Sequence, residues 1–157
     1  MNKKLYFVLL FTLFLIGCEP DDICLAETPG TPQIILTFFD KTNPEIKKKV
    51  TDLQIKGVDN ERIAYSGTSD SIAIALKTAS LTTSFIFTTT TSNTSYSDTL
   101  TLNYDSHDIF ISRACGFKTT YSNLTIKQSN PINWITSIEI INNTISDINT
   151  SHVKILH

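Results

Sequence analysis

The residues with the most distinctive chemistry in this sequence are its three cysteines, Cys18, Cys24 and Cys115. A cysteine can carry a lipid, form a disulfide, bind a metal or act as a nucleophile, and its surroundings decide among these fates. Cys18 and Cys24 lie only six positions apart, whereas Cys115 is distant in the sequence. An odd number of cysteines in an exported protein leaves one without a disulfide partner. One of the three is therefore expected to have a separate role.

The sequence before Cys18 assigns that role to it. A basic start is followed by a mostly apolar run at residues 5–16, which ends in the letters LIGC. A membrane-spanning helix needs roughly 20 apolar residues, so this shorter run is typical of an export signal. The ending resembles the bacterial lipobox, which implies cleavage before Cys18 and attachment of a lipid to it. Residues 1–17 are then a signal peptide, and a buried N-terminal element with an incidental cysteine is the alternative.

Lipidation of Cys18 leaves Cys24 and Cys115 as a pair. Disulfides persist in the oxidising compartments that exported proteins reach. We therefore expect a Cys24–Cys115 disulfide, with two unpaired thiols as the alternative. Residues 18–32 form the lipidated N-terminus and tether, and residues 33–157 form a single domain.

The tether itself is acidic, because Glu19, Asp21 and Asp22 follow the lipidation site directly. This cluster resembles the export signal that sends some Bacteroidetes lipoproteins to the cell surface. A solvated linker explains the acids equally well. The sequence thus leaves open whether the domain lies on the surface or on the periplasmic face of the outer membrane.

The composition describes a mildly acidic chain of β type. It has 157 residues, with 13 Lys and Arg against 15 Asp and Glu, for a formal net charge of −2. This balance gives no reason to bind nucleic acid. Apolar residues alternate with polar ones, most clearly where Leu100, Leu102 and Tyr104 share one face of a strand.

Turn signals separate eight or nine short predicted strands. They cover residues 33–39, 50–58, 72–77, 83–90, 99–104, 108–113, 117–127, 134–141 and 153–156. This pattern predicts an all-β fold, an antiparallel β-sandwich of immunoglobulin-like or similar Greek-key type, with a closed β-barrel as the alternative. Only residues 45–49 look helical, for about one turn. Arg113 would face the core of a regular strand, so we expect a bulge near Gly116, or else burial of Arg113 against a carboxylate.

Residues 105–108 (DSHD) form the densest cluster of potential metal ligands. They read as a hairpin turn, in which neighbouring side chains splay apart, so no metal site is expected. His152 and His157 flank the last strand on opposite sides, so we expect two surface histidines and no joint ligation.

Catalytic motifs are not recognised in the sequence. There is no Gly-x-Ser-x-Gly elbow and no glycine-rich phosphate loop, and the cysteines are already assigned. We expect neither enzyme activity nor a cofactor, with a hydrolase kept as the remote alternative. Ser71 and Thr99 lie in Asp-Ser-Ile and Asp-Thr-Leu sequences, which resemble the O-glycosylation motif of Bacteroidetes envelope proteins; plain strand-edge polarity is the alternative.

Several stretches together resemble a known group of proteins. They are the opening Cys-Glu-x-Asp-Asp-Ile-Cys pattern from Cys18, residues 109–118 (IFISRACGFK), and the closing HVKILH at 152–157. The chain is similar, over nearly all of its mature length, to an uncharacterised family of small flavobacterial lipoproteins with a domain of unknown function. The resemblance implies a lipoprotein in which Cys24 and Cys115 are family features, and it supplies no activity.

We therefore expect an envelope lipoprotein that is held in the outer membrane by its N-terminal lipid and has a non-catalytic binding or structural role. Its partner is an unidentified protein or glycan. The alternative is a periplasm-facing accessory subunit of envelope assembly or transport.

Overall fold

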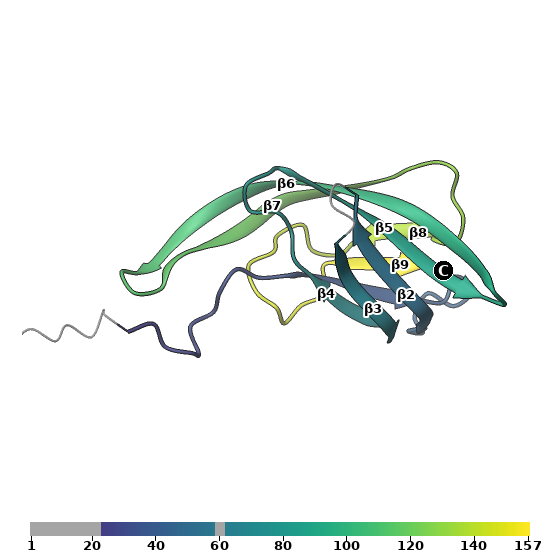
Figure 1. The fold of residues 1–157 in the computed structure, drawn as a ribbon, viewed down its shortest axis with the longest axis horizontal. Helices are drawn as coiled ribbons and strands as arrows, with labels where there is room; N and C mark the ends of the chain where they lie inside the picture. Colours follow the sequence, from purple (N-terminus) through teal and green to yellow (C-terminus); the bar gives the residue numbers. More distant parts are fainter. Residues whose placement is uncertain (1–22, 59–61) are drawn as a thin grey trace, which may run out of the picture. The chain divides into compact units, whose positions relative to one another are not determined.

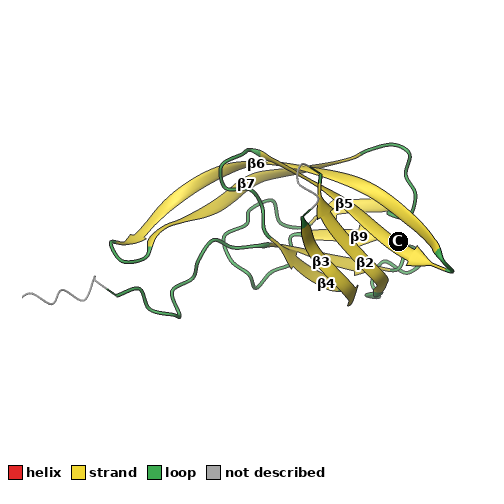
Figure 2. Cartoon of the chain, viewed as in Figure 1, coloured by secondary structure: helices red, strands yellow, loops and turns green. Residues whose placement is uncertain are grey.

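The computed structural model describes residues 23–58 and 62–157 (Figure 1). The signal peptide predicted at 1–17, Cys18 and the acids of the tether lie outside these residues. The described chain folds into strands and loops without a helix (Figure 2). In this part of the chain, no helix is long and apolar enough to cross a membrane.

The described residues form nine strands in two sheets. The strands are β1 (Ile34–Phe39), β2 (Val50–Gly57), β3 (Ile63–Ser69), β4 (Ser71–Ile74), β5 (Thr82–Thr91), β6 (Thr94–Ser112), β7 (Gly116–Gln128), β8 (Ser137–Ile140) and β9 (Val153–Leu156). One sheet has the order β4-β1-β9-β8 and the other β3-β2-β5-β6-β7 (Figure 1). The predicted all-β sandwich is confirmed. One pairing departs from the antiparallel pattern, because β1 and β9 run parallel.

Alternating apolar side chains fill the core between the sheets. In β6, Leu100, Leu102 and Tyr104 are buried, on the face that the sequence predicts. The other sheet contributes buried side chains such as Leu36 and Phe38 of β1. Each large apolar side chain removed from water contributes about 1.5–3 kcal/mol, so the period-two pattern of the sequence selects this packing.

Residues 105–108 are not a turn, contrary to the sequence prediction. They lie inside β6, which runs unbroken through two strands predicted as separate. Their polar side chains find partners on β7: Asn123 Nδ2 donates to Asp105 Oδ2 at 2.7 Å, and Thr119 Oγ1 donates to Asp108 Oδ1 at 2.7 Å. Cross-strand hydrogen bonds thus stabilise an extended conformation for residues that favour turns locally.

Two other local predictions are corrected, and one strand is added. Residues 45–49 are not helical; they return beside β1, where Lys48 N donates to Phe38 O at 3.0 Å. Strand β3 was not predicted, because it is a sheet edge without a fully buried side chain. Arg113 is neither buried nor in a bulge: it is exposed and begins the turn that joins β6 to β7. Gly116 ends that turn with φ of 72°, a conformation that favours glycine.

Contacts divide the described residues into two compact units. The sandwich unit consists of Pro29–Ile109 and Lys118–His157, residues 59–61 excepted. The second unit consists of residues 23–28 together with Phe110–Phe117, and we call it the disulfide unit.

Candidate functional site

The predicted disulfide is present in the disulfide unit. Cys24 and Cys115 are bonded, with their Cα atoms 4.8 Å apart and a sequence separation of 91. Cys115 N donates to Ser112 Oγ at 3.0 Å, which helps to fix the turn that presents the cysteine. A cross-link closing so long a loop stabilises a fold by roughly 4–5 kcal/mol in the chain-entropy account. The cysteine pair is therefore structural.

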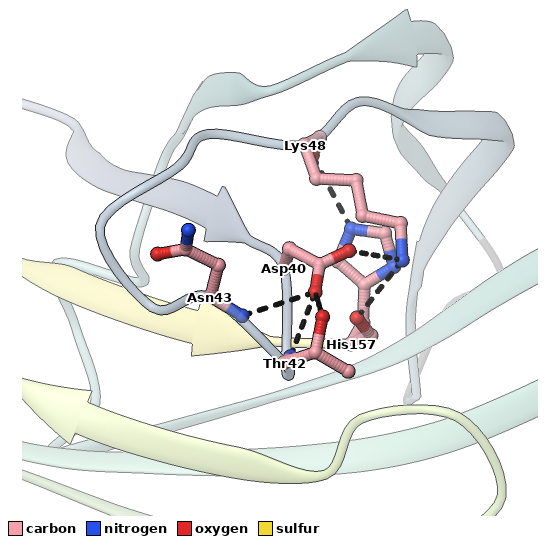
Figure 3. Close-up of polar contacts among 5 residues, drawn as sticks. All are labelled: Asp40, Thr42, Asn43, Lys48 and His157. Atoms are coloured by element: carbon pink, nitrogen blue, oxygen red, sulfur yellow. Dashed lines mark hydrogen bonds and ion pairs between the residues drawn. The ribbon is translucent and has the colours of Figure 1, made fainter.

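In the sandwich unit, the loop between β1 and β2 is organised around Asp40 (Figure 3). Asp40 Oδ1 accepts hydrogen bonds from Thr42 N at 2.7 Å, from Asn43 N at 3.2 Å and from the Thr42 hydroxyl. Asp40 Oδ2 pairs with Lys48 Nζ at 3.0 Å. The Thr42 hydroxyl bond, and then Lys48, hold the pKa of Asp40 well below its usual range. The Asp-x-Thr-Asn sequence thus folds the loop as Asx-type turns do.

His157 joins this loop to the end of β9 (Figure 3). Lys48 Nζ donates to His157 O at 3.3 Å, and His157 Nε2 lies 3.2 Å from Lys48 O. Because a carbonyl only accepts, Nε2 carries the proton. Burial is the main cause of the lowered pKa of His157. The ring lies edge-on to Phe38 and Trp134, at centroid distances of 6.2 and 5.7 Å, so His157 is a half-buried packing residue and not the surface histidine predicted.

Trp134 is held in place by a buried carboxylate. Asp98 of β6 accepts backbone hydrogen bonds from Asn133, Trp134 and Ile135, each at 2.8 Å. The Trp134 indole Nε1 donates to Phe87 O at 3.1 Å. Three backbone donors converging on one buried carboxylate fix both the path of this loop and the ring that it carries.

These two loops border a groove of about 520 Å³, which we call the basic groove. Its chemistry comes from Lys41, Lys48, Lys49, Tyr96, Trp134 and His157, with threonine hydroxyls and the Asn133 amide around them. The residues that line it include no aspartate or glutamate. The groove therefore combines ammonium groups, aromatic rings and hydroxyls, and it concentrates positive charge on a net acidic protein.

Sequence reasoning missed the basic groove because its residues come from separate elements. Tyr96 lies in β6, Trp134 precedes β8, and the lysines lie between β1 and β2. The available local signals were the lysine run at 47–49 and the turn sequence that begins at Asp40. Neither signal shows what lies opposite it in the fold.

His152, predicted at the surface, is fully buried. Its Nδ1 accepts a hydrogen bond from Ile35 N at 3.1 Å, and its Nε2 is buried without a hydrogen-bond partner. Burial lowers the pKa of His152 below its ordinary value of 6.5. The parallel pairing of β9 with β1 places this histidine beside the first strand.

The residues at 105–108, which the sequence shows as a cluster of potential ligands without predicting a metal site, are spread along β6. His107 Nε2 lies 3.1 Å from Ser122 Oγ of β7, as a surface cross-strand contact. Among residues 23–58 and 62–157, no group of three His, Cys, Asp or Glu side chains is placed to hold a metal ion.

The two O-glycosylation candidates are half-buried strand residues. Ser71 pairs with Thr37 across β4 and β1, and Thr99 pairs with Ile86 across β6 and β5. Modification of either residue stays a prediction. The aspartate before Thr99 is the loop anchor Asp98, which by itself explains the acid at that position.

Together these features define an all-β sandwich with one disulfide and a basic groove. The chain belongs to a family of unknown function, DUF6452, whose model matches residues 52–157. The match begins inside β2, so it includes Cys115 but not Cys24. No curated protein and no solved structure shows significant similarity to the chain. Membership of an uncharacterised family is thus confirmed, while the flavobacterial lipoprotein character stays a prediction.

Proposed function

We propose that this chain is an envelope lipoprotein, anchored in the membrane by a lipid on Cys18, whose sandwich has a non-catalytic binding role. The LIGC sequence after a short apolar run supports the anchor. The Cys24–Cys115 disulfide supports export, because such bonds persist outside the reducing cytoplasm.

The basic groove is the observation that carries the binding role. Its lysine loop is fixed by Asp40 and its Trp134 loop by Asp98, so the site is largely formed before a ligand arrives. A preformed site loses less entropy on binding. A few polar groups beside aromatic rings are typical of small-ligand sites.

The ligand class that fits this lining is a saccharide carrying carboxylates. Lys41 and Lys49 offer ammonium groups to the carboxylates, while Lys48 is partly neutralised by Asp40. Tyr96 and Trp134 offer apolar ring surface to the C–H faces of sugar rings. Threonine hydroxyls and the Asn133 amide suit sugar hydroxyls.

Calorimetric titration tests the ligand class, with an oligogalacturonate as the acidic probe and a cello-oligosaccharide as the neutral one. Lys41→Gln and Lys49→Gln should each weaken oligogalacturonate binding by up to about fivefold, as expected for exposed charge contacts. Tyr96→Ala should weaken it by about three- to tenfold. Lys127→Gln, an exposed lysine outside the groove with the same change of charge, is the matched control. Equal binding of the neutral probe, an equal effect of the control, or no oligogalacturonate binding by the wild type would contradict the proposal.

Metabolic labelling with an alkyne fatty acid tests the anchor. The wild-type chain should take up the label and Cys18→Ala should not; equal labelling of both would refute lipidation at Cys18. Protease treatment of intact cells, with a periplasmic protein as control, then shows on which side of the outer membrane the domain lies. Digestion without lysis supports an extracellular binding role. Protection until the outer membrane is broken favours the alternative, an accessory subunit that faces the periplasm.

A further inference from the structure

The disulfide unit exposes an unusual share of large apolar side chains. Ile23 and Leu25 are 74 and 65% exposed, and Phe110 and Phe117 are 56 and 69% exposed. All four lie within two short segments joined by the Cys24–Cys115 bond. A concentrated patch of exposed apolar groups in a folded protein marks an interaction surface.

The two phenylalanines form one contiguous part of this surface. Phe110 lies near the end of β6 and Phe117 near the start of β7, on either side of the turn. Their ring centroids are 5.3 Å apart, with an interplanar angle of 64°. An aromatic pair that stays accessible to water gains little from burial within its own fold, so its apolar surface is available to another phase or molecule.

The charge of the unit does not oppose contact with lipid. Its described residues carry one acid, Glu27, and one base, Arg113, so their formal charges cancel. These described residues therefore add no repulsion of their own from a charged headgroup layer, although the acids Glu19, Asp21 and Asp22 precede them in the sequence.

The covalent connection between Cys18 and the disulfide unit indicates which apolar surroundings the aromatic pair can reach. Cys24 follows Cys18 by six positions, and an extended chain spans at most about 3.6 Å per residue, or roughly 20 Å in all. The disulfide connects Cys115, and with it the turn between the phenylalanines, to this short segment of residues 18–24. A lipid on Cys18 would therefore keep the aromatic pair close to the bilayer, where a high effective concentration favours even weak contacts.

We propose that the disulfide unit is a second membrane contact, in which Phe110 and Phe117 enter the interfacial region of the bilayer beside the acyl anchor. This inference rests on the proposed lipidation of Cys18. Combining a lipid with a second apolar contact is an established route to firm attachment. It would also restrict rotation of the disulfide unit at the membrane surface, because an acyl anchor alone leaves the attached protein free to rotate.

Site-specific photo-cross-linking tests this contact in the full-length lipidated protein. The photoreactive analogue benzoylphenylalanine replaces Phe110 or Phe117, and the purified protein is placed in phosphatidylethanolamine–phosphatidylglycerol vesicles. Ile132 and Ile148, which are 56 and 65% exposed in the sandwich unit, receive the same analogue as controls matched for exposure. After illumination, mass spectrometry identifies each adduct as lipid or protein.

We expect lipid adducts from positions 110 and 117 and their absence from positions 132 and 148. Lipid adducts that are no more frequent at 110 and 117 than at 132 and 148 would overturn the proposal. Adducts to a second copy of the chain would also overturn it, because they would make the surface a dimer contact.

A separate readout distinguishes failure of this inference from failure of the lipid anchor. The fatty-acid label reports on Cys18 independently of the cross-links. Labelled protein without lipid adducts at 110 and 117 rejects the second contact and leaves the anchor intact. Absence of the label from the protein rejects the lipid anchor, and with it the short connection to the membrane on which this inference rests.

Discussion

The buried carboxylate of Asp98 supports a quantitative prediction. Asp98→Ala removes the acceptor for the backbone N–H groups of Asn133, Trp134 and Ile135. A hydrogen bond to a charged group contributes about 1.5–3 kcal/mol, and three bonds to one carboxylate are not additive, so we expect a loss of about 4 kcal/mol in the free energy of unfolding. This is a large share of the 5–15 kcal/mol that is usual for a domain. Asp98→Asn keeps one carbonyl acceptor but turns an amide donor toward the same N–H groups, so it should cost about 2 kcal/mol.

Urea unfolding, followed by circular dichroism and by the fluorescence of the single tryptophan, measures these losses. Trp134 reports directly on the loop that Asp98 holds, so its native emission should shift to the red in Asp98→Ala. Asp105→Ala is the matched control: it is an exposed aspartate of the same strand with one side-chain partner, Asn123. The control should lose no more than about 0.5–1 kcal/mol. If Asp98→Ala stays within about 1 kcal/mol of the wild type and its emission is unchanged, the three hydrogen bonds do not hold the loop as argued.

Two further predictions concern the disulfide and the buried histidine. Replacing both Cys24 and Cys115 by serine should lower the free energy of unfolding by roughly 4–5 kcal/mol, and dithiothreitol should have a similar effect on the wild type; unchanged stability in both cases contradicts a stabilising cross-link. Burial lowers the pKa of His152 in the folded state. The neutral form of His152 therefore contributes its full stabilisation above about pH 6.5, and this contribution is lost as the pH falls through the folded-state pKa. His152→Asn, which keeps an acceptor for Ile35 N, should therefore flatten the fall of stability in acid, measured by urea unfolding at about pH 7 and pH 5; an unaltered slope contradicts the assignment. His157, whose pKa burial also lowers, acts in the same direction and should flatten the slope further when it is replaced as well.

The parts of the fold that the sequence predicts correctly are those that depend on local pattern and on cysteine chemistry. Leu100, Leu102 and Tyr104 repeat at period two, and burial of that face follows directly. The Cys24–Cys115 pair was expected because Cys18 is predicted to carry a lipid, which leaves two cysteines for a disulfide. Neither inference requires knowledge of which strands are neighbours.

The predictions that failed required that knowledge. Residues 105–108 favour a turn by themselves, but Asn123 and Thr119 across the ladder make an extended strand favourable. His152 is adjacent to solvated turn residues in the sequence, yet the parallel β1–β9 pairing buries it. The basic groove is missed for the same reason, since its lysines and aromatic rings meet only after both sheets have formed.

The β1–β9 pairing has a consequence for the order in which this chain folds. Strand β1 lies inside its sheet between β4 and β9, although it is the first strand and β9 the last. Until Val153–Leu156 are free to pair, β1 has one open edge and β8 lacks the neighbour that connects it to the rest of the sheet. A chain that is still threaded through a ribosome or a translocation channel at those residues therefore cannot close its core. The sheet with the order β4-β1-β9-β8 is therefore completed only after the last strand has been released.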